Sequence, residues 1–375
     1  PLLRQVGLAR LLGSGDLVYS QQGRLLAQRF DSRRKALTGP VVPIDETGLG
    51  DGSREPLEWS CAADGTLVYA PVTRSRGAAR GLVWIDRQGN REPLDLPGPW
   101  EWDWARLSPD GGRMVTGCGA SSGQYDVWLH DLERGTSTRL TLHPAANYLP
   151  VWSPDGKRVV FVSGREGGVG NLFWKAADGS DRSERLTESE LPQMPFCFTP
   201  DGRSLLFGER LHPRRSTSLW RLDLEGDRTP SLLLDTRSMD RCAALSPDGR
   251  WLAYSSDESG REEVYVRPWP DLGQRWQISA NGGMQPLWNP RGGELFYLED
   301  DRMMSVTVES EPDFRPSAPQ VLFEGLEHSI FPSFDVAPDG ERFLVPVWHD
   351  DAGAPINELV VVLNWMQELA RHTRP

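Results

Sequence analysis

The sequence Gly-Ala-Ser-Ser-Gly, residues 119–123, comes nearest to a catalytic motif in this chain. The pattern Gly-x-Ser-x-Gly exposes a nucleophilic serine when it forms a tight elbow between a strand and a helix. Here the residues that follow, 126–132, alternate as in a strand. We therefore place Ser121 in a hairpin loop and expect no serine nucleophile and no catalytic residue.

Residue types that hold metals are present but scattered. The cysteines form no Cys-x-x-Cys pair, and three of the four fall in apolar strand positions, where a reduced cysteine packs as a small hydrophobe. Asp178-Gly-Ser-Asp181 could hold calcium weakly, but it lacks the full set of ligands of a calcium-binding loop, and its residue types are typical of a turn. The histidines have no ligand spacing and are expected at the surface or in loops: His130, His143, His212, His328, His349 and His372. We expect neither a metal nor a cofactor.

A tryptophan-rich stretch is the best candidate for a binding site. Trp100, Trp102 and Trp104 alternate with acidic residues, so in a strand the indoles share one face with Arg106. They could cap the fold by packing on neighbouring loops, which the cost of exposing tryptophan favours, or form an aromatic shelf for a peptide or sugar. The candidate ligand-binding residues are Trp102, Trp104, Arg106, Asn147, Gln193, Asp240 and Gln285.

Composition limits the classes of partner. The net charge of −12 and pI of about 5.1 would repel a phosphate backbone, so we expect no nucleic acid partner. No apolar run approaches the roughly 18 residues needed to span a membrane. The 38 glycines and 30 prolines favour many short strands over long helices.

A repeated turn organises the whole chain. Ser-Pro-Asp-Gly or a close variant recurs at spacings of 43 to 48 residues, the period of one propeller blade of four short strands. In this turn Pro presets φ, Asp accepts from nearby backbone donors, and Gly takes the left-handed position that follows. We call the residue at the Asp position of each turn its marker. The markers are Asp64, Asp110, Asp155, Asp201, Asp248, Arg291 and Asp339, with a weaker first copy at Asp16.

The strand before each turn predicts how the repeats pack. Positions three and five residues before the marker are apolar in every clear copy, and they share a face that must pack against a neighbouring blade. We predict an all-β propeller of eight four-stranded antiparallel blades, with seven as the alternative, in a single domain closed by residues 1–5 completing the last blade. The predicted modules are 6–45, 57–97, 103–141, 149–187, 195–235, 241–279, 285–323 and 333–365, followed by a tail, 366–375.

From residue 15 to 365 the chain resembles the TolB-like propeller at the C-terminal end of bacterial transmembrane serine/threonine protein kinases. The resemblance lies in the turn series and in four stretches, 82–94, 126–141, 255–270 and 357–369. In that family a kinase domain and one membrane helix precede a propeller that lies outside the membrane. The kinase motifs are missing here, so the resemblance implies a non-catalytic sensor or docking module in an extracytoplasmic or periplasmic location.

Because the mixed polar and apolar face of the inner strands would line a channel through the ring, we expect a protein, peptide or small molecule to bind at the mouth of this channel. Two alternatives remain open. One is a stand-alone TolB-like periplasmic scaffold, and the other is the propeller of a prolyl-oligopeptidase-like peptidase without its hydrolase domain, for which the repeats leave no space. The sequence determines neither the ligand nor the oligomeric state.

Overall fold

The regular structure of the described part of the chain consists of strands. The structure is a computed structural model, in which all the described elements are strands; this confirms the all-β prediction. No described residue belongs to a helix able to cross a membrane. The described residues are 6–12, 15–21, 24–43, 59–61, 67–69, 80–96, 101–119, 125–165, 169–211, 216–235, 238–309, 313–326, 334–348 and 360–362.

The chain forms two compact units. The first comprises Pro1–Ala78, Ser121–Gly123 and His349–Pro375, and the second comprises Ala79–Ala120 and Gln124–Trp348. The first unit contains an antiparallel sheet of four strands and another of three. In sheet order the strands are β1 (Val6–Leu11), β2 (Asp16–Gln21), β3 (Arg24–Asp31) and β4 (Ala36–Pro43), then β32 (Val360–Val362), β6 (Leu67–Tyr69) and β5 (Trp59–Cys61).

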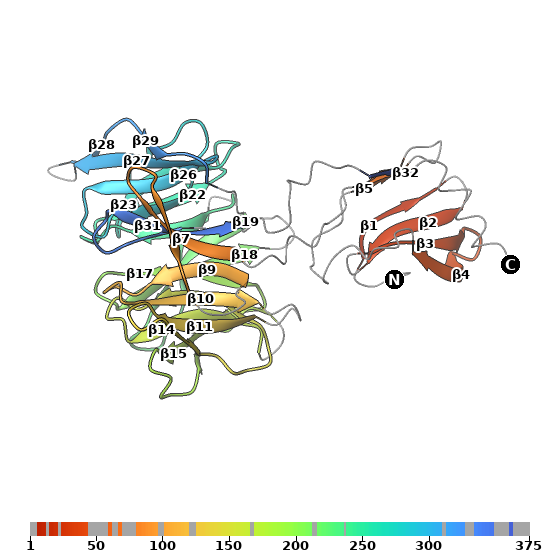
Figure 1. The fold of residues 1–375 in the computed structure, drawn as a ribbon, viewed down its shortest axis with the longest axis horizontal. Coiled ribbons are helices and arrows are strands. Elements are labelled where there is room, and N and C mark those ends of the chain that lie inside the picture. Colours follow the sequence, from red (N-terminus) through yellow and green to blue (C-terminus); the bar gives the residue numbers. More distant parts are fainter. Residues whose placement is uncertain are drawn as a thin grey trace. The chain divides into compact units, whose positions relative to one another are not determined.

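The second unit contains six antiparallel sheets, five of which follow the predicted repeat (Figure 1). The first three are β9 (Glu101–Leu107), β10 (Arg113–Gly119), β11 (Tyr125–Asp131) and β12 (Thr136–Arg139); β13 (Asn147–Trp152), β14 (Arg158–Ser163), β15 (Asn171–Ala176) and β16 (Glu184–Arg185); and β17 (Gln193–Phe198), β18 (Ser204–Leu211), β19 (Ser216–Asp223) and β20 (Ser231–Leu234). The next two are β21 (Arg241–Leu245), β22 (Trp251–Ser256), β23 (Glu263–Pro268) and β24 (Trp276–Gln277); and β25 (Met284–Trp288), β26 (Glu294–Glu299), β27 (Arg302–Glu309), β28 (Arg315–Pro316) and β29 (Gln320–Phe323).

The sixth sheet joins two distant segments and corrects the prediction of how the last blade is completed. Its order is β30 (Asp335–Val336), β31 (Arg342–Trp348), β7 (Arg80–Asp86) and β8 (Arg91–Leu94). Figure 1 shows the blue β31 beside the orange β7. We predicted that 359–365 and residues 1–5 would complete this sheet. Instead β7 and β8 complete it, and β32 pairs with β6; residues 1–5 lie outside the described residues.

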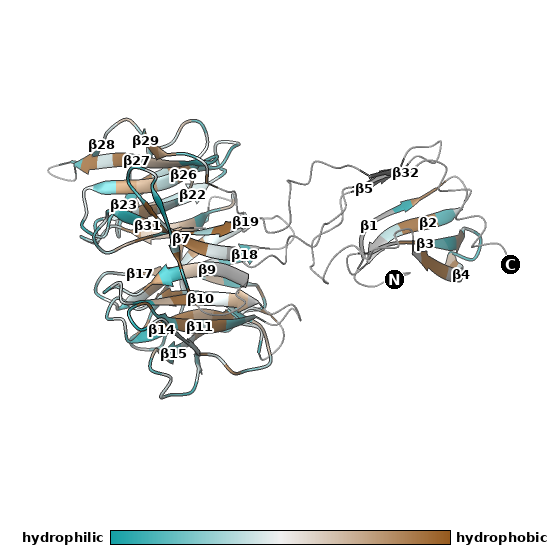
Figure 2. Cartoon of the chain, in the orientation of Figure 1, coloured by the Kyte–Doolittle hydropathy of each residue, from teal (hydrophilic) through white to brown (hydrophobic). Residues whose placement is uncertain are grey.

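Each sheet of the second unit is apolar on both faces. Along β14, Val159 and Phe161 pack toward the preceding sheet, while Val160 and Val162 pack toward the following one. Figure 2 shows such apolar residues as brown segments along the strands. Six clusters of buried residues each lie between two successive sheets. One of them joins the sheet of β31 and β7 to the sheet of β9 and β10. Packing between sheets therefore runs in a cycle through the six sheets of the second unit, here called the ring, while the eight blades predicted for the whole chain stay a prediction.

The repeated turn has the predicted chemistry. In the copy at Ser153, the hydroxyl donates to Asp155 Oδ1 at 2.6 Å, and the Lys157 amide donates to the same oxygen at 3.0 Å. Gly156 donates its amide to the Ser153 carbonyl at 2.9 Å and has a φ of 65°, in the left-handed region that favours glycine. Equivalent hydroxyl–carboxylate bonds form at Ser108–Asp110, Thr199–Asp201 and Ser246–Asp248.

We expect Trp152→Ala to lower the free energy of unfolding by about 3 to 5 kcal/mol. Trp152 is buried in the cluster between the sheets of β10 and β14, and its Nε1 donates to the Arg106 carbonyl at 3.1 Å. The control Asp155→Ala removes turn hydrogen bonds alone and should cost about 1 kcal/mol. Chemical denaturation measures both changes. A loss below about 1 kcal/mol for Trp152→Ala would show that packing between sheets does not stabilise this ring.

His130 corrects the expectation that the histidines lie at the surface or in loops. Its side chain is fully buried in β11, with its ring nitrogens 2.9 Å from the Thr116 hydroxyl and 2.7 Å from the Ser137 hydroxyl. Burial lowers the pKa of His130 to about 4 from the usual 6.5. Full stability is therefore present above pH 6.5, and it falls as the pH drops from 6.5 through about 4, because only the unfolded chain takes up the proton readily.

The matching experiment compares the wild type with His130→Gln. Between neutral pH and about pH 4 the wild type should lose about 3 kcal/mol more unfolding free energy than the variant. Urea denaturation across this pH range measures the difference. Equal pH dependence in the two proteins would contradict this prediction, because it would mean that His130 takes up its proton as readily in the folded chain as in the unfolded chain.

Candidate functional site

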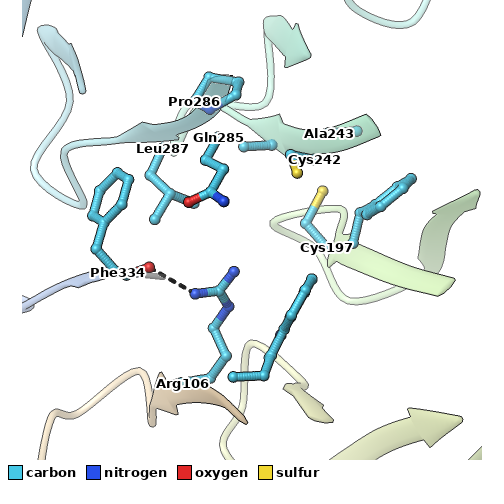
Figure 3. Close-up of a pocket in the computed structure, with 11 residues that line it drawn as sticks. Arg106, Cys197, Cys242, Ala243, Gln285, Pro286, Leu287 and Phe334 are labelled. Carbon is cyan, nitrogen blue, oxygen red and sulfur yellow. Dashed lines mark hydrogen bonds between the residues drawn. The ribbon is translucent and has the colours of Figure 1, made fainter. Parts of the chain in front are cut away.

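A small cavity lies where inner strands of the ring converge. It has a volume of about 50 Å³, and its lining residues belong to β9, β17, β21 and β25 and to the segment just before β30. Figure 3 shows Arg106, Cys197, Cys242 and Gln285 around it. We call it the central cavity; its lining is Trp104, Arg106, Phe196, Cys197, Cys242, Ala243, Ala244, Gln285, Pro286, Leu287 and Phe334.

A repeated β-bulge shapes this cavity. In β9, β13, β21 and β25 the residue six positions before the turn marker has a positive φ: 63° at Trp104, 54° at Leu149, 53° at Cys242 and 57° at Gln285. At each of these positions the pairing with the next strand shifts register. A non-glycine residue in this conformation costs of order 1 kcal/mol, which the surrounding ring must offset. The bulge interrupts the side-chain alternation on which our face assignment depended.

Trp104 fills the middle of the ring. It is only 6% exposed and belongs to the cluster between the sheets of β14 and β18, although its own strand lies in the sheet of β10. Its Nε1 has no hydrogen-bond acceptor among the described residues. Trp104 therefore packs into the core between sheets, and the hypothesis that these tryptophans cap the fold against neighbouring loops stays a prediction. Trp102 lies in β9 opposite Cys118. The Trp102 side chain and Trp100 lie outside the described part of the chain.

Arg106 supplies a positive charge to the central cavity. Its guanidinium lies 5.2 Å from the centre of the Trp104 ring, and its Nη1 donates to the Phe334 carbonyl at 2.8 Å, the bond drawn in Figure 3. The neighbouring Asp335 accepts from the Leu107 and Val336 amides, and burial raises the pKa of this carboxyl, with Arg106 opposing the rise. No described residue forms a salt bridge with Arg106.

Two predicted ligand-binding residues are engaged in buried hydrogen bonds. Asn147 Nδ2 donates to the Ala145 carbonyl at 2.7 Å, and its Oδ1 accepts from Arg165 at 2.9 Å. Gln193 accepts from the Thr187 hydroxyl and donates to Glu209 at 2.9 Å. Both side chains lie at the start of an inner strand and are less than 5% exposed, so their amides stabilise the ends of those strands.

The remaining predicted residues are also buried. Asp240 is fully buried beside the start of β21, and Gln285 is 3% exposed and lines the central cavity. Of the seven predicted residues, the structure brings Trp104, Arg106 and Gln285 together around the central cavity.

Our sequence reasoning missed the two thiols of the cavity. Cys197 and Cys242 are half-buried on adjacent inner strands, and Figure 3 shows both sulfur atoms toward the cavity. They stand four and six positions before their turn markers, a signal visible only once the bulge is known. Burial raises the pKa of both thiols to about 12, so the reactive thiolate is disfavoured at neutral pH.

The other candidate chemistry receives no support from the described residues. Ser121 lies outside them. Asp178 accepts from the Ser180 hydroxyl and amide, and Asp181 accepts from the Ala176 amide, as turn residues do. Among the described residues no group of three or more His, Cys, Asp or Glu side chains is placed to hold a metal ion.

Comparisons with known proteins define the fold. No family model matches the chain. An uncharacterized protein of Agrobacterium fabrum is 29% identical over 159 residues, which cover 40% of this chain and 53% of that protein. The Tol-Pal system protein TolB of Helicobacter pylori is 32% identical over 80 residues, 21% of this chain and 19% of TolB. The chain thus spans about half or less of these curated relatives.

A solved structure agrees with this relationship. The structure of a putative TolB from Agrobacterium tumefaciens matches with a TM-score of 0.59 at 16% identity, covering 72% of this chain and 99% of that one. Together with the ring of antiparallel sheets, this match defines the class: the protein is a β-propeller. Its fold is TolB-like.

We expect Cys197 and Cys242 to resist alkylation in the folded chain. A shift in thiol pKa from 9.0 to about 12 lowers the thiolate fraction at mildly alkaline pH on the order of a thousandfold. Iodoacetamide labelling with peptide mapping should show at least a hundredfold slower modification than in the urea-unfolded chain, which serves as the control. Rapid labelling of the folded chain would show that the cavity is open and well solvated.

Proposed function

We propose that this chain is a non-catalytic binding module that recognises a protein or peptide ligand at the centre of its ring. We further propose that it acts outside the cytoplasm as the sensor domain of a bacterial serine/threonine protein kinase. The observation that carries the binding role is the central cavity, where Arg106 places a cation among mostly apolar walls. A few polar groups placed in an apolar concavity are typical of ligand sites.

The chemistry of the cavity supports binding in preference to catalysis. Its two thiols carry raised pKa values, whereas a nucleophilic cysteine requires a lowered one. The kinase role is supported by the order of four sequence stretches along the chain, which resembles that of kinase-linked propellers. The extracytoplasmic location is supported by the same resemblance and by the similarity to Tol-Pal system proteins.

A peptide library tests the binding role. Peptides displayed on phage are selected on the immobilised chain, and the enriched sequences are measured by calorimetry. We expect saturable binding that weakens at least tenfold in Arg106→Ala, because this removes the only charged side chain that lines the cavity among the described residues. Arg291→Ala, at an exposed turn, is the control and should bind as the wild type does. Enriched peptides indifferent to Arg106→Ala would place the site elsewhere.

The kinase role has its own test. The gene upstream of Pro1 should encode a membrane helix and a kinase domain, and replacing Arg106 in that longer protein should change autophosphorylation in response to the selected peptide. An upstream sequence without a kinase domain would contradict the sensor role and favour a TolB-like scaffold.

A peptidase propeller is the second candidate. It is favoured by 24% identity over 180 residues to YuxL, an uncharacterized peptidase of Bacillus subtilis, of which this chain covers 27%. Under this hypothesis the ring would control access to a hydrolase domain. A fluorophosphonate probe that labels Ser121 stoichiometrically would support hydrolase chemistry in this chain, and we expect no labelling.

A further inference from the structure

Trp104 and Arg106 both line the central cavity, and each carries a side-chain hydrogen-bond donor. Trp104 is more than nine-tenths buried, and its Nε1–H has no acceptor among the described residues. A buried donor without an acceptor carries a desolvation cost that an acceptor in the cavity would remove. The unused donor therefore indicates what a ligand must supply, which is an oxygen acceptor.

The charge of the cavity indicates that this acceptor is anionic. Arg106 lines the cavity, forms no salt bridge with a described residue, and donates to the Ala105 and Phe334 carbonyls. In the space adjoining the cavity, the charge of Glu262 is balanced by Arg241 at 3.0 Å. The nearby Asp335 carboxyl already accepts two backbone amides. Arg106 also interacts electrostatically with Asp335, but that carboxyl is held by backbone amides, so the guanidinium can still donate to a carboxylate or phosphate ligand.

Volume and wall chemistry select the carboxylate. About 50 Å³ accommodates a few water molecules or one group the size of a carboxylate, and no whole ligand of drug size. A phosphate dianion would need more donors than one guanidinium, one indole and the Gln285 amide, because the other walls are mainly hydrocarbon and sulfur. An apolar tail next to the carboxylate would contact Phe196, Leu287 and Phe334.

We propose that the central cavity binds the carboxylate of a ligand, with the Trp104 Nε1–H and the Arg106 guanidinium as its donors and an apolar tail against the surrounding walls. The proposal rests on the binding role above and names the group that is recognised. That carboxylate belongs either to a peptide, at its C-terminus or an acidic side chain, or to a free organic acid.

Indole NMR on the full chain, labelled with ¹⁵N at tryptophan, tests the proposal directly. Butyrate is titrated against the wild type, with the uncharged isostere butyramide as control; Trp104→Phe assigns the indole signal. We expect a saturable downfield shift of the Trp104 N–H signal with butyrate and none with butyramide. An unmoved Trp104 signal at tens of millimolar butyrate, or an equal response to butyramide, would overturn the carboxylate site. Inorganic phosphate binding as tightly as butyrate would overturn the choice of carboxylate.

Variants separate donor loss from general damage. Arg106→Gln and Trp104→Phe should each weaken butyrate binding at least tenfold, and Arg106→Lys should retain more affinity than Arg106→Gln. The matched control is Trp251→Phe. Trp251 is 8% exposed and its Nε1 also has no acceptor among the described residues, but it lies in the cluster of Val264 and Phe314, away from the cavity. Equal weakening by Trp251→Phe would mean that the loss comes from the fold.

Peptides distinguish the source of the carboxylate and separate this proposal from the binding role. Each peptide selected above is compared with a free C-terminus, with a C-terminal amide, and with its acidic side chains replaced by amides. Affinity that depends on one carboxylate identifies a peptide source, and butyrate binding without any peptide binding identifies a free acid. Peptides that bind equally well in all forms would overturn the carboxylate proposal while leaving the binding role intact.

Discussion

Burial of both faces of every sheet is the constraint on which the second unit depends. Residues such as Val159 and Val160, adjacent along β14, enter separate clusters on opposite faces, so a sheet left at the end of a row would expose an apolar face to water. Closure of the ring removes such ends. The sixth sheet provides that closure by pairing β31 with β7, strands more than two hundred residues apart, so the ring forms only when distant segments meet.

The same constraint produces the central cavity. Inner strands converge on the axis of the ring, and their bulges place Trp104, Cys242 and Gln285 in left-handed conformations where regular strands would continue. Trp104 then reaches a cluster that belongs to two other sheets. The backbone strain of these positions is held by packing between sheets, so the geometry of the cavity and the stability of the ring have a common origin.

Part of this structure could be predicted and part could not. The turn at Asp155 and the packing of Trp152 follow from residues a few positions apart, and both predictions are confirmed. The cavity was predicted in part: Trp104, Arg106 and Gln285 line it, but Cys197, Cys242 and Phe334 were missed. A β-bulge inserts one residue into a strand without a distinctive sequence, and it shifts the alternation from which faces are assigned.

The sequence alone determined the repeat, the turn chemistry and the all-β class, because these depend on side chains and backbone within one short segment. Tertiary structure decided which strands complete which sheet. The predicted modules 57–97 and 333–365 would have paired β6 with β7 and β31 with β32; in the structure β31 pairs with β7 and β6 pairs with β32. All four strands are short and apolar and can pair antiparallel in either combination, so local pattern cannot choose between them. The choice depends on which pairing buries apolar faces throughout the ring.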